Sequence, residues 1–145
     1  MSIPSFQSNG NLPEGIHLAT WQEVENTLGF NERRKELLAG LKRACESLKL
    51  AGCKRIYIDG SFATSKEYPG DFDGCWQDDT VDFIYLKSID PVLLDFTNKR
   101  AMQKAKYGGE LFPASYQADI YGKTFVEFFQ EDRNGNAKGI IAIDL

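Results

Sequence analysis

The chain has 145 residues, a length that fits one domain with a sizeable hydrophobic core and no need for disulfide bonds or structural metals. Hydrophobic residues make up 42% and aromatic residues 12% of the sequence, which excludes an intrinsically disordered protein. The net charge of −4 argues against a generally basic surface for coating nucleic acid and favours a small or capped anionic substrate, while leaving room for a local basic strip.

The sequence carries no sign of membrane insertion or export. No apolar run approaches the ~20 residues that span a bilayer, and the first residues lack the basic and apolar regions of a signal peptide. We therefore expect a cytoplasmic protein with no membrane partner. The three cysteines, Cys45, Cys53 and Cys75, lack metal-ligand spacing, which disfavours structural zinc. The only histidine, His17, precedes the first predicted helix, which disfavours a Ser-His-Asp triad.

The first fifty residues predict an irregular arm and two helices. Residues 1–19 contain two prolines and two glycines and are expected to be irregular. Thr20 and Glu23 form a capping-box pattern for a short helix that ends near Gly29. Asn31 caps a longer helix that Gly52 ends, and its apolar residues recur at helical spacing: Leu37, Leu41, Ala44 and Leu48. This apolar stripe requires a sheet to pack against.

The remaining residues predict four strands and two further helices. Strands are expected at residues 55–59 and 71–77, joined by a loop over residues 61–70. Asp90-Pro91 predicts a helix to about Tyr107, ended by Gly108-Gly109, although residues 92–96 alone also fit a buried strand. A strand at 110–112, a short helix at 124–130 and a strand at 139–145 follow. The predicted class is α+β (mixed α/β), with a mixed sheet of about four strands packed against helices in one domain, residues 1–145.

The most informative stretch joins the first two of these strands. Asp71 and Asp73 stand at i and i+2 in an extended segment, so they project from one face, toward the Gly60-Ser61 turn if the two strands pair. Two carboxylates on one strand can bind Mg²⁺ and leave coordination positions for phosphate oxygens.

The turn before these carboxylates has the properties of a phosphate-binding loop. Gly60 lets the backbone approach a phosphate closely, and Ser61 adds a hydroxyl donor. Lys66, in the connecting loop, can neutralise further negative charge, with Thr64 as a weaker contact. Together these residues could hold a nucleoside triphosphate for in-line attack at one phosphorus.

Each part also has an explanation that needs no ligand. A Gly-Ser pair commonly ends a strand, an isolated Asp-x-Asp is usually a solvated face, and Lys66 resembles many solvated loop lysines. Arg100, Lys104 and Lys106, with Lys99 nearby, form either a solvated helix face or a basic strip for a polyphosphate or an RNA end. Three aromatic residues are expected to be core or a partner surface: Phe125, Phe128 and Phe129.

With these motifs the chain resembles the nucleotidyltransferase superfamily of the polymerase-β type. The pattern of that superfamily is an apolar residue, Gly, then Gly or Ser, followed after about nine to thirteen residues by Asp-apolar-Asp/Glu. Ile58-Asp59-Gly60-Ser61 and Asp71-Phe72-Asp73 match it, with Asp59 inserted before the glycine. More closely, the chain is similar to a family of small bacterial and phage proteins of unassigned function, classed as nucleotidyltransferase-like, through residues 60–64, 90–96, 107–114 and 138–141.

The resemblance implies a minimal nucleotidyltransferase fold and a Mg²⁺-dependent transfer of a nucleoside monophosphate from a triphosphate to a hydroxyl, with release of pyrophosphate. Asp71 and Asp73 would be the catalytic metal ligands, and Gly60, Ser61 and Lys66 would bind the nucleotide. The acceptor stays open between RNA, a protein side chain and a small molecule.

Active members of the superfamily carry a third carboxylate on a later strand. Here Glu110 and Asp144 are the candidates, with Asp95 and Asp119 as weaker ones. Because no single residue is the obvious choice, an alternative stays open: a catalytically silent binding module, such as an antitoxin-like protein partner in a toxin–antitoxin or phage-defence system.

Overall fold

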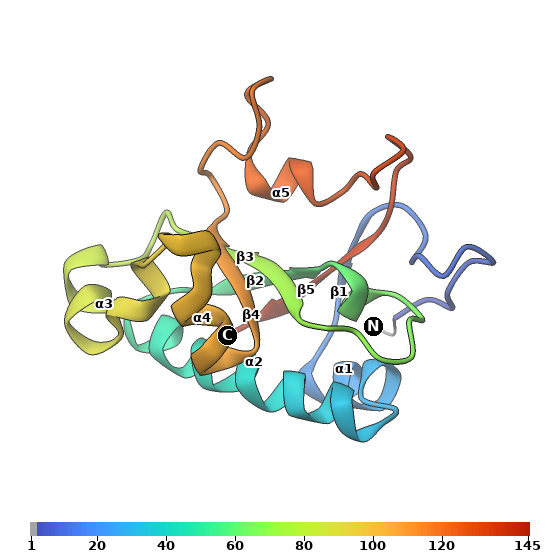
Figure 1. Cartoon of the computed structure of the whole chain (residues 1–145), viewed down its shortest axis with the longest axis horizontal. Coiled ribbons are helices and arrows are strands. Elements are labelled where there is room, and N and C mark those ends of the chain that lie inside the picture. Colours follow the sequence, from blue (N-terminus) through green and yellow to red (C-terminus); the bar gives the residue numbers. More distant parts are fainter. Residues whose placement is uncertain (1–2) are drawn as a thin grey trace.

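A five-stranded mixed sheet organises residues 3–145, the part of the chain that this computed structural model describes (Figure 1). The strands lie in the order β1-β5-β2-β3-β4. β1 runs parallel to β5 and β3 parallel to β4, whereas β2 is antiparallel to both of its neighbours. The strand bounds are β1 (Ile16–Leu18), β2 (Arg55–Asp59), β3 (Phe72–Trp76), β4 (Gly109–Pro113) and β5 (Ile140–Asp144). The predicted α+β class is confirmed, with five strands instead of about four.

The additional strand is β1, which lies inside the arm that the sequence predicts to be irregular. Ile16, His17 and Leu18 pair with residues 140–142 of β5 at the edge of the sheet. Three residues next to Gly15 carry too little alternation to be recognised as a strand, and their partner lies far away in the sequence. The prediction for residues 1–19 is therefore wrong at β1, and residues 1–2 lie outside the described part of the chain.

The first two helices confirm the sequence prediction. α1 (Trp21–Leu28) begins with the capping box: the Thr20 hydroxyl accepts a hydrogen bond from the Glu23 amide, and Glu23 accepts one from the Thr20 amide. α2 (Glu32–Leu50) begins at Asn31, whose side chain accepts a hydrogen bond from the Arg34 amide. The apolar positions at helical spacing are all buried: Leu37, Leu41, Ala44 and Leu48.

The single continuous helix predicted from Asp90 to Tyr107 is wrong, and only its C-terminal part, which ends at Tyr107 before Gly108, is an α-helix as predicted. The chain instead forms α3 (Phe83–Ile89), which was not predicted, two 3₁₀ turns, η2 (Pro91–Leu94) and η3 (Asn98–Arg100), and α4 (Ala101–Tyr107). Asp90 does not cap a helix with its side chain, because its buried carboxylate accepts hydrogen bonds from Lys106 and from the Tyr107 hydroxyl. Residues 98–100 all have positive φ, a conformation that non-glycine residues seldom adopt and that composition does not predict.

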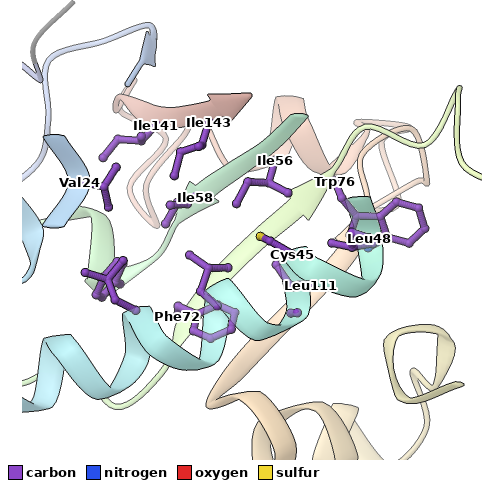
Figure 2. Close-up of a cluster of buried hydrophobic side chains, with 14 of the residues drawn as sticks. Val24, Cys45, Leu48, Ile56, Ile58, Phe72, Trp76, Leu111, Ile141 and Ile143 are labelled. Atoms are coloured by element: carbon purple, nitrogen blue, oxygen red, sulfur yellow. The ribbon is translucent and has the colours of Figure 1, made fainter. Parts of the chain in front are cut away.

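The main hydrophobic core lies between the sheet and α2 (Figure 2). Ile56 and Ile58 of β2 and Phe72 and Trp76 of β3 share this face, opposite α2 residues such as Leu48. Phe72 and Trp76, at alternate positions of β3, are both fully buried. Within residues 3–145, no helix combines the length and apolar character needed to cross a membrane.

The opposite face of the sheet is covered in part by residues 114–139, which we call the flap and which include α5 (Phe125–Phe128), short as predicted (Figure 1). The rings of Phe112 on β4 and Phe125 in the flap stack with 4.1 Å between their centroids. A small second cluster surrounds this pair, with Cys75, Phe129 and Ile140 buried in it. The two faces of the sheet therefore differ: one packs on helices, and the other holds a hollow beside this cluster.

Candidate functional site

Three carboxylates lie side by side where β2 ends and β3 and β4 begin. Strand register sets Asp59 opposite Asp73, and Asp73 opposite Glu110. Directly opposed residues of neighbouring strands project from the same face of a sheet, about 5 Å apart. All three line the hollow beneath the flap. We call Asp59, Asp73 and Glu110 the carboxylate row.

The two outer members of the row are neutralised by cations from this chain. Glu110 accepts from Arg100 Nη2 at 2.9 Å and from Lys104 Nζ at 3.1 Å. Asp59 is 2.9 Å from Lys138 Nζ, and both side chains of that pair are largely buried. Among the described residues, no cation forms an ion pair with Asp73, the central carboxyl.

The central carboxyl consequently favours its protonated form. Burial, followed by the negative charge of Asp71 and the contact with Glu110, raises the pKa of Asp73 to about 7. Burial acts in the same direction on Glu110, but hydrogen bonds from Lys104, Arg100 and Asp73 outweigh it and lower the pKa of Glu110. Of these two neighbouring carboxyls, Asp73 therefore holds a proton more readily than Glu110 does. Asp73 is therefore the member of the row whose negative charge, once it ionises, a bound cation would neutralise.

Gly60 lies against this central carboxyl. Its φ is +76°, and a Cβ atom at this position would collide with the Asp73 carboxylate and lie 3.1 Å from Asp73 Cβ. Ser61 follows as the first residue of the 3₁₀ turn η1 (Ser61–Ala63). The structure therefore brings the Gly60-Ser61 turn and Asp73 together across the antiparallel β2–β3 pair, as the sequence predicted.

Arg34 fixes the loop that follows Gly60. Its fully buried guanidinium donates to several loop carbonyls, including Phe62 at 2.8 Å and Lys66 at 2.6 Å. Burial lowers the pKa of Arg34 to about 10, so the group stays charged at neutral pH. Sequence reasoning missed this residue, which lies in a run of charged residues at the start of α2. The signal was its helical spacing from Leu37, Leu38 and Leu41, which sets it on the buried stripe.

A cleft of about 1060 Å³ separates the carboxylate row from the flap. The predicted residues Gly60, Ser61, Lys66 and Asp73 all line it, together with Thr64. The flap contributes cationic and aromatic side chains that sequence reasoning did not assign to the site, namely Tyr121, Lys123, Arg133 and Lys138, and also Phe128, which it had expected to be core or a partner surface. Tyr121 is 84% and Phe128 44% exposed, so the cleft offers ring surface as well as charge.

Asp71 lies next to the row, but its side chain lines a neighbouring hollow. It directly precedes β3 and lines a groove of about 400 Å³ beside α2 and α4 instead of the cleft. Burial and the nearby Glu110 raise the pKa of Asp71, and Lys104, Arg33 and Lys66 partly oppose that rise. Asp71 and Asp73 therefore influence each other electrostatically while they line adjoining hollows.

Strand register separates the candidates for a third carboxylate. Glu110 hydrogen-bonds with Asp73, whereas Asp144 lies at the other end of the sheet and forms an ion pair with Arg55 at 2.6 Å. Asp95 is part of an exposed turn with Thr97. Asp119 lines the cleft from the flap, but its carboxylate accepts hydrogen bonds from flap amides.

The basic strip predicted over residues 99–106 is divided in the structure. Arg100 and Lys104 bind Glu110, while Lys106 binds the buried Asp90. Arg100 also lies over the ring of Phe112, 5.4 Å from its centroid. Arg100 therefore belongs to the cleft, and Lys104 and Lys106 line the groove beside Asp71.

Two carboxylates of this region, Asp71 and Asp73, are candidate donors for Mg²⁺. In the described part of the chain, no group of three or more Asp, Glu, His or Cys side chains is arranged to hold a metal ion. Mg²⁺ typically uses one or two carboxylates and completes its shell with water and substrate phosphates. Asp71 and Asp73 supply hard oxygen donors of that number, and Asp73 lacks a counter-ion from the described residues. Arg100 and Lys104 both bind Oε1 of Glu110, which leaves Oε2 outside these two ion pairs.

Comparison with known proteins gives a family without an assigned role. One family profile, described as a family of unknown function (DUF6932), matches residues 4–144. No curated protein and no solved structure matches the chain significantly.

Proposed function

The chain belongs to the DUF6932 family of unknown function, and we propose that it is a Mg²⁺-dependent nucleotidyltransferase that moves a nucleoside monophosphate from a triphosphate to a hydroxyl acceptor and releases pyrophosphate. One observation carries the proposal: Asp73, a half-buried carboxyl without a counter-ion among the described residues, lies between Glu110 and the positive-φ residue Gly60 at the floor of a cleft. The resemblance of the two motifs to polymerase-β-type enzymes supports it. A cytoplasmic location is part of the proposal, since nucleoside triphosphates are abundant there.

The proposed roles follow from the position of each side chain. Asp71 and Asp73 would hold Mg²⁺, which would neutralise charge on the attacked phosphate and on the leaving pyrophosphate. Gly60 leaves room for the Asp73 carboxylate itself, and Ser61 and Lys66 offer a hydroxyl and an ammonium group at the same wall of the cleft. Arg34 acts indirectly, because it fixes the loop carbonyls and so positions Ser61 and Lys66.

Transfer is tested with labelled triphosphates. The purified protein is incubated with each of the four α-labelled nucleoside triphosphates, Mg²⁺ and cell extract, and labelled macromolecules are separated and identified. We expect label with the natural chain and none with the double variant Asp71→Asn, Asp73→Asn. The variant Asp79→Asn, at an exposed loop position, is the matched control and should label normally. Equal labelling by the double variant, with its fold verified by circular dichroism, would refute the proposal.

A second candidate is a catalytically silent module that binds a protein partner, as an antitoxin does. The observation that favours it is the neutralisation of Glu110 by Arg100 and Lys104, because these contacts stabilise the row without a metal. Calorimetric titration of ATP in the presence and absence of Mg²⁺ separates the two candidates. A silent module should show no Mg²⁺-dependent nucleotide binding, whereas the enzyme should.

A further inference from the structure

One wall of the cleft is made of aromatic rings that begin beside the carboxylate row. Phe112 stands two positions after Glu110 in β4, so both side chains project from the same face of the sheet, and both line the cleft. The rings continue onto the flap, because Phe125 stacks on Phe112 with 4.1 Å between centroids and Phe129 lies 5.8 Å from Phe125. Phe128 ends the series, 6.0 Å from Phe129. We call these four rings the ring wall.

Phe128 is the member of the ring wall that is open to the cleft. Phe129 is buried, and Phe112 and Phe125 stack on each other, whereas 44% of Phe128 is exposed. Phe129 meets the Phe128 ring at an interplanar angle of 59°, so it does not stack on the Phe128 face. In the part of the chain that the structure describes, no other ring contacts Phe128. Its aromatic face is therefore available to a flat ligand in the cleft.

The flap adds no excess of charge of either sign to this side of the cleft. The flap residues that line the cleft include equal numbers of acidic and basic side chains: Asp119, Glu131 and Asp132, and Lys123, Arg133 and Lys138. Lys123 forms an ion pair with Glu131 at 2.6 Å, and the Asp119 carboxylate accepts hydrogen bonds from two flap amides. The part of a ligand that lies against the flap is therefore expected to be uncharged.

The cleft thus combines a charged floor with an aromatic wall. The floor holds the carboxylate row with Ser61 and Lys66, and the wall presents Phe128. A ligand that complements both surfaces has a charged end and a flat, uncharged, aromatic end, and every nucleotide has these two ends. We infer that the base of the nucleotide stacks on Phe128 while its phosphates lie at the carboxylate row. This inference rests on the proposed function and names the part of the substrate that the flap recognises.

Two probes that share a phosphate chain test the inference without reference to catalysis. ATP and inorganic tripolyphosphate are each titrated calorimetrically into the full chain in the presence of Mg²⁺. We expect Phe128→Leu, which keeps an apolar side chain but removes the ring, to weaken ATP binding about tenfold, a loss typical of one stacking contact with a base. Its affinity for tripolyphosphate should not change. The matched control is Tyr85→Leu, which removes a ring of α3 that is 43% exposed and lies outside the cleft, and it should change neither affinity.

A second variant reports stacking directly and keeps an aromatic ring in the flap. Phe128→Trp adds a fluorophore, and its emission, taken as the difference from the natural chain, should be quenched by ATP but not by tripolyphosphate. Three outcomes overturn the inference: unchanged ATP affinity in Phe128→Leu, an equal loss of affinity for both probes in that variant, or equal affinity of the natural chain for the two probes. Absence of quenching in a Phe128→Trp variant that binds ATP also overturns it.

These measurements and the labelling experiment can fail independently. ATP binding that depends on Phe128, without transfer of label to any acceptor, refutes the transferase alone, because stacking on the flap requires no chemistry. Transfer of label by the natural chain, with equal ATP affinity in Phe128→Leu, refutes the inference alone. Absence of ATP binding to the natural chain also overturns the inference, and the labelling experiment then decides whether the chain is a transferase.

Discussion

Gly60 combines a backbone conformation that only glycine adopts readily with contact to a carboxylate. Its φ of 76° and ψ of −167° lie in a region where other residues cost about 1–3 kcal/mol. We predict that Gly60→Ala lowers the free energy of unfolding by at least that amount, because the new methyl group must also displace the Asp73 carboxylate. Urea denaturation measures the loss, and the displacement should abolish Mg²⁺-dependent nucleotide binding.

Gly122 is a matched control for the backbone effect. It has a φ of +86°, and a Cβ atom there would meet no atom within 4 Å. Gly122→Ala should therefore cost stability through backbone strain alone and leave nucleotide binding intact. If both variants bind nucleotide equally, the contact between Gly60 and Asp73 does not position the carboxylate.

From the raised pKa of Asp73 we predict that the stability of the chain depends on pH in metal-free buffer. Because burial and neighbouring charge raise its pKa to about 7 in the folded chain, its contribution to stability is complete below pH ~4, the ordinary aspartate value, and is lost as the pH rises through about 7. Asp73→Asn removes the ionisation. The stability of the natural chain relative to this variant should thus fall between pH 4 and 7, as measured by urea denaturation at each pH.

Asp95 provides a control with the opposite sign. Hydrogen bonds from the Thr97 hydroxyl and amide lower the pKa of Asp95, so its contribution is present above the ordinary aspartate pKa and is lost as the pH falls. The stability of the natural chain relative to Asp95→Asn should therefore rise with pH, by a small amount because Asp95 is solvent-exposed. Parallel pH profiles for Asp73→Asn and the natural chain would show that Asp73 ionises normally.

At the scale of elements, the flap packs on the sheet through the stack of Phe125 on Phe112. The rings of Phe125 and Phe112 are nearly parallel, at 4°, and Phe125 also contacts Phe129. We predict that Phe125→Ala lowers the free energy of flap opening by about 1–3 kcal/mol while β2 and β3 keep their protection. Hydrogen exchange of flap amides measures this. Phe128→Ala, at a half-exposed ring of the same helix, should have a smaller effect, and equal effects would contradict the assigned role of the stack.

Sequence predicted the elements whose signals are local. Thr20 and Asn31 predict where α1 and α2 begin, because the hydrogen bonds that cap a helix involve residues only two or three positions away. The prediction for residues 90–107 failed because the structure there depends on contacts between residues far apart in the sequence. Asp90 looks like a helix cap, but its carboxylate is used by Lys106 and Tyr107, so the chain turns back on itself instead of continuing as one helix. Tertiary contacts of this kind leave no local pattern.

The candidate site also contains some residues that could be predicted from local sequence and others that could not. Gly60 and Asp73 could be predicted because one strand, one turn and the next strand bring them together. Glu110 could not be chosen over Asp144, since the choice depends on the β3–β4 register across a connection of more than thirty residues. Lys138 was missed because its partner, Asp59, is adjacent only after β5 has paired with β2.

For the whole molecule, the sheet places the main hydrophobic core on one face and the residues of the proposed chemistry on the other. The face toward α2 is closed by the main core and carries the large apolar side chains of β2 and β3. The opposite face holds the carboxylate row, the cleft and a flap that packs through a much smaller cluster. Asp73→Asn therefore tests chemistry without opening the core, whereas substitution of Asp59 or Glu110 would also leave its cationic partners unpaired.

Binding of Mg²⁺ and ATP can therefore be detected as an increase in the stability of the whole chain. A ligand that binds only the folded chain stabilises it by about 1.4 kcal/mol at ten times its dissociation constant, which corresponds to a rise in Tm of roughly 2–6 °C for a chain of this size. We predict such a rise for the natural chain with Mg²⁺ and ATP, relative to a buffer of equal ionic strength. Asp73→Asn should show none, since it removes the central donor, and Gly122→Ala should show the full rise. An equal rise in Asp73→Asn would mean that the metal binds elsewhere on the chain.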